Sequence, residues 1–245
     1  MNSAKKSNTS NLHVFFNGLS PVIRIARQAQ RKVDRLAATQ FSLFDFFNEQ
    51  EENLSRIFGE MLKPTGTHGQ GDKFLYLFLD EVKKVLDIEV REGFPSTDLY
   101  DSRIDLEHQT YNRRKIDIVI RVPETRGDKW IGIENKPWAG EQTNQLRDYL
   151  DHLQKQAGSY AWLVYLSGDG SLPKTLPDNP EDKKCCCTLP FRCAKFESPS
   201  LESWLVRCIS ACEAERVRWF LTDLLNYIQK HFIISDPIGE ENDDD

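Results

Sequence analysis

The spacing of apolar residues changes near residue 87, and this change limits the folds available to the chain. Apolar residues first recur every three to four positions, which predicts helices over residues 21–39, 45–62 and 73–86. They then alternate with other residues, which predicts strands over 88–92, 102–107, 115–122 and 129–135. The rest of the chain predicts a helix over 140–156, a strand over 160–166, a loop over 168–184, and helices over 198–212 and 214–232. Helices that enclose a small group of strands indicate one α/β or α+β domain with a helical extension.

The composition is that of a soluble globular protein. Of the 245 residues, 39% are hydrophobic and 29% are charged. The longest apolar run is YAWLVYL, residues 160–166, far short of the roughly 18 residues that a membrane span needs. The N-terminal residues lack the apolar segment of a signal peptide. We therefore expect no membrane association and a cytoplasmic location.

Six cysteines lie between residues 185 and 212, and three of them are consecutive. Consecutive cysteines do not readily pair with each other, and no histidine close by completes a zinc set. The sequence therefore favours reduced thiols in a cytosolic protein, with a zinc-binding or redox role as the alternative.

Charge is unevenly distributed along the chain, whose formal net charge is −6. Five acidic residues lie in 240–245, and five basic residues against one aspartate lie in 24–35. We expect an N-terminal extension over 1–40 with a basic helix, a main domain over 41–233 and a disordered acidic tail over 234–245. Arg27 and Arg31 of the basic helix are candidates for contact with nucleic acid, with a solvated helix face as the alternative.

Charged residues interrupt two of the expected strands. In 129–136, Ile131 and Ile133 point to one face, while Glu134 and Lys136 point to the other. In 115–122, three isoleucines at 116, 118 and 120 share one face and Asp117 takes the opposite one. If the strands pair with their isoleucines together, the three charged side chains lie on one side of the sheet, and Gly132 leaves room beside them. Buried charges need such partners, because an isolated buried charge is costly.

Two carboxylates and an ammonium group suit metal-assisted chemistry on a phosphate. Mg²⁺ prefers oxygen ligands and uses one or two carboxylates together with substrate phosphates. The ion lowers the pKa of a bound water and offsets charge on the phosphate, while a lysine orients or helps to deprotonate that water. The combination indicates phosphodiester hydrolysis.

Asp117 followed seventeen residues later by Glu134-Asn135-Lys136 resembles the D…(D/E)xK signature of the PD-(D/E)XK nuclease superfamily. The resemblance implies a restriction-endonuclease-like α/β core, a central mixed sheet flanked by helices, and Mg²⁺ held by Asp117 and Glu134, with Mn²⁺ as a substitute. Ile116 stands where the proline of the signature would be. Two further ExK matches, at 81–83 and 181–183, lack the strand context.

The flanking helices extend this resemblance over roughly residues 44–166. Gln145 and Tyr149 resemble the Q-x-x-x-Y helix of one branch of the superfamily, which implies contacts with the lysine, the attacking water or the phosphate. In EENLSRIFGEML, residues 51–62, Glu52 resembles the leading-helix glutamate that reaches the metal, and Glu51 is the alternative. For both pairs, ordinary surface roles on a helix are the competing interpretation.

The resemblance implies a nuclease, and DNA rather than RNA is the expected substrate because most such relatives cut DNA. A role in bacterial or phage defence or in DNA processing is an expectation of the same kind. Arg113, Arg114 and Lys115 precede the Asp117 strand and are further candidates for phosphate contact. An RNase on the same scaffold and a non-catalytic adaptor that binds protein or nucleic acid are the alternatives, and a protein partner or a homo-oligomer stays open.

Overall fold

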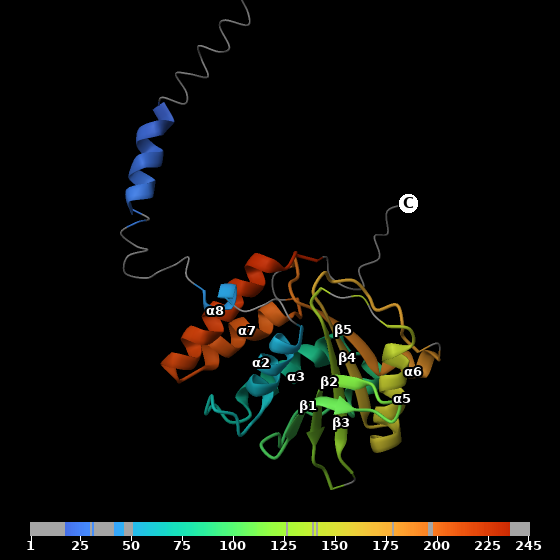
Figure 1. Ribbon diagram of the computed structural model, residues 1–245. Coiled ribbons are helices and arrows are strands. Elements are labelled where there is room, and N and C mark those ends of the chain that lie inside the picture. The colour runs from blue at the N-terminus through green and yellow to red at the C-terminus, as the bar shows by residue number, and fades with distance from the viewer. Residues whose placement is uncertain are drawn as a thin grey trace, which may run out of the picture. The chain divides into compact units, whose positions relative to one another are not determined.

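The structure is a computed structural model, and it describes residues 18–29, 31, 42–46, 51–125, 127–138, 140, 142–177, 179–195 and 198–235 (Figure 1). The chain divides into two compact units, residues 1–45 and 46–245. In the first unit, residues 18–29 and 31 are helical, within the region where the sequence predicts a basic helix. A short 3-10 helix, η1, spans Leu43–Phe46. The other positions of the predicted 21–39 helix, and residues 236–245 of the acidic tail, lie outside the described residues.

The second unit is built on a five-stranded mixed sheet, which confirms the predicted fold class. Its strands follow one another in the order β1-β2-β3-β4-β5. They are β1 (Arg103–Gln109), β2 (Lys115–Val122), β3 (Lys129–Lys136), β4 (Ala161–Ser167) and β5 (Cys186–Pro190). The first three pair antiparallel, whereas β3, β4 and β5 pair parallel. The parallel part begins where helix α5 (Gln145–Ala157) connects β3 to β4.

Helix α5 covers one face of the sheet (Figure 1). Its apolar residues Leu146, Leu150 and Leu153 join a buried cluster with side chains of β2 and β4. Gly132 of β3 allows this close approach, since a Cβ atom there would lie 2.7 Å from Leu153 Cδ1. The room at Gly132 is therefore filled by α5 and does not open beside the charged residues, contrary to the expectation from the sequence.

The opposite face is covered by helices α2 (Glu51–Leu62) and α3 (Lys73–Val85), with α7 (Leu201–Ala211) packed on α3 and α8 (Glu215–His231) packed on α7 (Figure 1). Large aromatic side chains fill the space between them. Phe58 and Phe78 both meet Trp204 edge-on, at centroid distances of 6.1 and 5.4 Å. The Trp204 indole N–H donates to the Phe74 carbonyl at 3.0 Å, which satisfies the polar atom of this buried ring.

The register of β2 and β3 places isoleucines opposite isoleucines. Ile118 pairs with Ile133, and Ile120 with Ile131, as the alternating pattern predicts. Ile116 departs from this pattern, because it packs with Val119 in the cluster under α5. The distortion lies at Glu107 of β1, which has a φ of 49°. Glu107 and Asp117 are absent from the paired positions of β1 and β2, and the pairing of β2 with β3 begins at Ile118.

Two predictions about secondary structure are wrong, and one strand was not predicted. Residues 88–91 form a short helix, α4 (Ile88–Arg91), instead of a strand, because Asp87 accepts a hydrogen bond from Glu89 N–H at 2.9 Å and starts a helical turn. Within the predicted 168–184 loop, α6 (Pro180–Lys184) begins at Asn179, whose side chain accepts from Glu181 N–H. The cysteine-rich segment supplies β5, which the sequence pattern did not indicate.

None of the helices in the described part of the chain combines the length and apolarity that a membrane crossing requires. All six cysteines are free thiols, and burial raises the pKa of Cys187 to about 12.

Candidate metal centre

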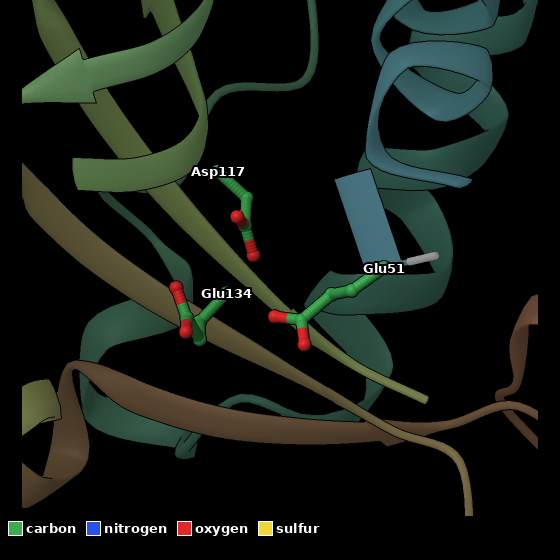
Figure 2. A group of neighbouring side chains, drawn as sticks. All are labelled: Glu51, Asp117 and Glu134. Carbon is green, nitrogen blue, oxygen red and sulfur yellow. The ribbon is translucent and has the colours of Figure 1, made fainter. Parts of the chain in front are cut away.

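Three carboxylates from three different elements converge at one end of the sheet (Figure 2). Glu51 comes from the first turn of α2, Asp117 from β2 and Glu134 from β3. One oxygen of each lies within 4.8 Å of the others. Figure 2 shows the three side chains directed toward a common space. The expected convergence of Asp117 and Glu134 is therefore present, and Glu51 joins them.

Glu51, and not Glu52, belongs to the carboxylate group. The resemblance implies Glu52 as the leading-helix glutamate, with Glu51 as the alternative. In the structure Glu52 is exposed, whereas Glu51 is partly buried and belongs to the carboxylate group. Adjacent helical residues point about 100° apart, so only one of the two can face the sheet. Glu51 also lies in the first turn of α2, where the helix dipole favours a negative charge.

Asn135 fixes the positions of both neighbouring acids. Its backbone N–H donates to Asp117 Oδ2 at 2.8 Å. Its side-chain Nδ2 donates to Ser55 Oγ at 3.0 Å and to the Glu51 carbonyl at 3.3 Å. Ser55 in turn donates to the Glu51 carbonyl at 3.0 Å. The central residue of the ENK tripeptide thus holds the start of α2 against the sheet.

Lys136 lies between two of the carboxylates. Its ammonium group forms ion pairs with Glu51 Oε1 and, at 2.8 Å, with Glu134 Oε1. Only 10% of the lysine side chain and 2% of the Glu134 side chain are exposed, so solvent screens this interaction weakly. The structure therefore brings Lys136 into the group in which the sequence predicts it.

Gln145 and Tyr149 of α5 extend the site on the other side of Glu134. Gln145 Nε2 donates to Glu134 Oε1 at 2.6 Å and to Tyr149 Oη at 3.0 Å. The Tyr149 hydroxyl donates to the Lys115 carbonyl at 2.5 Å. These hydrogen bonds connect the two side chains to Glu134 and to the backbone of β2, whereas the resemblance implied contacts with lysine, water or phosphate.

Burial and mutual repulsion disfavour ionisation of the acids. Burial, with the charge of Asp117, raises the pKa of Glu134 to about 8. Burial likewise raises the pKa of Asp117 to about 6, although the hydrogen bond from Asn135 opposes the shift. For Lys136, burial works to lower the pKa, but Glu134 and Glu51 outweigh it and raise the pKa above its usual value. Added positive charge would relieve the repulsion among the acids.

The residues present fit a hard divalent cation. All three candidate ligands are carboxylates, which suit Mg²⁺ and Mn²⁺. Glu134 Oε2 is buried and has no hydrogen-bond partner, although a buried carboxylate oxygen normally has one. A metal ion bound by Glu51, Asp117 and Glu134 would satisfy this oxygen.

The basic residues before β2 have different surroundings. Arg114 pairs with Asp148 at 2.9 Å and donates to the Thr143 carbonyl, so it anchors the start of α5. Lys115 pairs with Glu107 at 2.9 Å, and Arg113 is exposed with a φ of 61°. Arg27 and Arg31 are exposed on the helix of the first unit. Of Arg113, Arg114 and Lys115, Arg113 best suits contact with a ligand.

Asn135 and Ser55 are the positioning residues that the sequence analysis did not assign. Ser55 follows Glu51 by four residues, so both lie on one side of α2. Asn135 stands at the variable position of the ExK pattern, and nothing in the pattern marks it. Only the docking of α2 on β3 brings the two together.

Comparison with known families gives one match. The family model described as the PD-(D/E)XK nuclease superfamily matches residues 40–231. This range contains all three carboxylates, Lys136, and both α5 residues of the site. No curated protein and no solved structure matches the chain.

Proposed function

Because the chain belongs to the PD-(D/E)XK nuclease superfamily, we propose that it is a metal-dependent nuclease that hydrolyses phosphodiester bonds in DNA. Mg²⁺ is the proposed ion and Mn²⁺ a substitute. The observation that carries the proposal is the group of Glu51, Asp117 and Glu134 around Lys136, with one buried Glu134 oxygen left without a partner.

Each residue of the group has a proposed role. Glu51, Asp117 and Glu134 would hold the ion, which when bound supplies a more acidic water and offsets negative charge on the phosphate. Lys136 presents a fixed positive charge beside the acids and would orient the attacking water and stabilise charge on the phosphate. Gln145 fixes the rotamer of Glu134 through its 2.6 Å hydrogen bond, and Tyr149 fixes Gln145. Gln145 and Tyr149 are thus positioning residues.

The choice of DNA and a cytoplasmic location are the less direct parts of the proposal. DNA is chosen by analogy with the superfamily. The cytoplasmic location is supported by the free thiols of all six cysteines, since a reducing compartment keeps thiols unpaired.

The test is cleavage of single- and double-stranded DNA and RNA by the full-length protein, with Mg²⁺ and with EDTA. Asp117→Ala and Lys136→Ala are compared with Lys183→Ala, which alters the lysine of an ExK match in helix α6. We expect cleavage of DNA that requires Mg²⁺, falls at least 100-fold in the first two variants and is unchanged in the third.

Other outcomes separate the alternatives. Cleavage of RNA alone, with the same dependence on Asp117 and Lys136, would indicate an RNase. A protein that cuts nothing and binds no Mg²⁺ by calorimetry would contradict the nuclease proposal and favour an adaptor. Cleavage that persists in Asp117→Ala would assign the activity to a different site or to a contaminant.

A further inference from the structure

A cleft opens beside the candidate metal centre, at the carboxyl ends of β3 and β4. Its volume is about 470 Å³, within the range of roughly 300–1,000 Å³ typical of small-ligand sites. Lys136 contributes to both the metal centre and the cleft. Trp138, Tyr165, Lys174, His231 and Phe232 are among its other lining residues. A ligand held at the metal centre could therefore extend directly into this space.

Trp138 presents an aromatic surface at the cleft. It is 43% exposed, and its indole ring stacks on Phe232 at a centroid distance of 5.4 Å and an interplanar angle of 29°. A ring supported on one side and exposed on the other resembles the stacking platforms that bind nucleobases.

The backbone that carries Trp138 is held rigidly relative to Lys136. Gly168, which follows β4, donates its N–H to the Lys136 carbonyl at 3.0 Å. A Cβ atom at Gly168 would lie 2.0 Å from the Pro137 carbonyl oxygen, so the two segments are in the closest possible contact. The distance from the catalytic lysine to the indole is thus set by packing and not by a loose loop.

Among the described residues that line the cleft, two lysines, Lys136 and Lys174, stand against one acid, Asp169. The ammonium group of Lys136 is shared with Glu51 and Glu134. Asp169 accepts hydrogen bonds from the Ser171 backbone N–H at 2.9 Å and from the hydroxyls of Ser171 and Ser167, which lowers its pKa. An aromatic surface and lysine side chains in one cleft match the base and the phosphate of a nucleotide.

We infer that this cleft binds an unpaired nucleotide adjacent to the phosphodiester that is cut, with its base stacked on Trp138 and a phosphate near Lys174. The inference rests on the proposed function and narrows its substrate. A base inside a duplex is already stacked on both sides, and its extrusion requires the loss of that stacking and of its base pair. The substrate is therefore a single strand, or a duplex with an unpaired end or flap at the cut.

Binding without cleavage provides the test. In an Asp117→Asn background, fluorescence anisotropy at fixed salt measures the affinity for a labelled twelve-nucleotide thymidine strand, its uridine RNA equivalent and a blunt DNA duplex. Trp138→Leu is compared with Trp219→Leu, which removes an indole that is 67% exposed on α8 and absent from the cleft lining. Stacking predicts a loss of roughly five- to one-hundred-fold for the single strand with Trp138→Leu, and no change with Trp219→Leu.

Two further variants guard against misfolding. Trp138→Phe keeps an aromatic ring and is expected to recover part of the affinity. Lys174→Gln leaves the indole in place, and it is expected to weaken binding and to reduce the salt slope by about one phosphate contact. Circular dichroism melting of each variant establishes that it is folded.

The outcomes distinguish failure of the inference about the cleft from failure of the proposed nuclease function. Equal single-strand affinity of the two leucine variants, or equal losses for single strand and duplex, overturns the inference, and Mg²⁺-dependent cleavage by the wild type would still support the proposed function. If the wild type cuts nothing but single-strand binding depends on Trp138, the proposed function fails and the nucleotide cleft stands. A wild type that neither cuts nor binds overturns both.

Discussion

Two adjacent glutamates at the start of α2 have opposite surroundings, and the difference gives a sharp test at the residue scale. Glu51 belongs to the carboxylate group and pairs with Lys136, whereas Glu52 is exposed. We expect Glu51→Gln to lower Mg²⁺-dependent cleavage at least 100-fold and Glu52→Gln to change it less than twofold. Both substitutions remove one negative charge from the same helical turn. A difference in activity between the two variants therefore reflects the direction in which each side chain points, and not the loss of charge. Equal effects of the two would contradict the assignment of Glu51.

Asp117 should destabilise the protein when no cation is present. Burial and the charge of Glu51 raise its pKa to about 6, so at pH 7.5 the ionised form is held against an unfavourable environment. Asp117→Asn keeps an oxygen that can accept the Asn135 N–H but removes the charge. We expect the variant in EDTA to be more stable than the wild type by about 1–3 kcal/mol in urea unfolding.

Addition of Mg²⁺ should reverse that order. The ion binds the folded wild type and stabilises it by mass action, while Asp117→Asn lacks one ligand and gains less. A wild type whose urea midpoint does not move with Mg²⁺ would indicate that the three carboxylates do not form a metal site.

The choice between Glu51 and Glu52 shows where residue-level prediction fails. Asp117, Glu134 and Lys136 could be predicted because strand alternation fixes which side chains share a face. A helix gives no such certainty near its first residue, since a shift of one position turns the side chain by about 100°. Asn135 could not be predicted for another reason: its partners, Ser55 and Glu51, are 80 and 84 residues away.

At the scale of elements, the contact between α2 and β3 depends on a buried hydrogen bond. Asn135 Nδ2 and Ser55 Oγ lie 3.0 Å apart in a buried environment. Asn135→Ala and Ser55→Ala should each cost about 1–3 kcal/mol, because each leaves a buried partner unsatisfied. The double variant should cost less than the sum, by about 0.5–3 kcal/mol of coupling. Urea unfolding of the four proteins measures this, and strict additivity would indicate that the two side chains do not interact.

A second junction, between β1 and α5, contains two histidines whose ring nitrogens are 3.1 Å apart. The Tyr111 N–H donates to His152 Nδ1, so His152 Nε2 carries the proton that it shares with His108 Nε2. Burial lowers the pKa of both histidines. At His108, the charge of Asp105 opposes this shift and that of Arg121 adds to it. At His152, the charge of Lys155 adds to the shift. Both rings are therefore held neutral, and each fits only one tautomer.

This junction predicts a dependence of stability on pH. The unfolded chain takes up protons at a pKa near 6.5, above the lowered values in the fold, so protonation favours the unfolded state as the pH falls. The raised pKa values of Asp117 and Glu134 act in the opposite direction, so the histidine contribution is measured as the difference in free energy of unfolding between the wild type and His152→Gln. We expect this difference to favour the wild type most above about pH 6.5 and to fall between pH 7 and pH 5. Parallel pH profiles for the two proteins would contradict the assignment.

Element-level prediction succeeded where a periodic pattern was long and failed where local capping decided. Strands β2 and β3 could be recognised because each is eight residues long and carries isoleucines at alternate positions. The four residues of α4 carry too short a pattern, and Arg91 completes the turn by donating to the Leu86 carbonyl at 2.8 Å. Strand β5 was not predicted because cysteine and proline are weak indicators of a strand. Its pairing with β4, in which Leu163 lies opposite Cys186, is visible only in the structure.

Across the whole molecule, charge is the property most relevant to a nucleic-acid substrate. The formal net charge is −6, yet Arg27 and Arg31 project from an exposed helix in the first unit. If they contact phosphates, Arg27→Gln with Arg31→Gln should weaken DNA binding uniformly across sequences and reduce the salt slope by about 1.8. Lys83→Gln with Lys183→Gln provides a control of equal charge. Equal salt slopes for the two double variants would indicate that Arg27 and Arg31 face solvent and do not contact phosphates.

The candidate metal centre joins residues that are far apart along the chain: Glu51 precedes its ion-pair partner Lys136 by 85 residues. During synthesis, Glu51 therefore leaves the ribosome long before β3, the strand that carries Lys136. A nascent or truncated chain can carry all three acids and still have no assembled centre, because α2 must first dock on a paired β2 and β3. On the proposed function, the ability to cut would therefore be acquired only when α2 has docked on the paired strands β2 and β3.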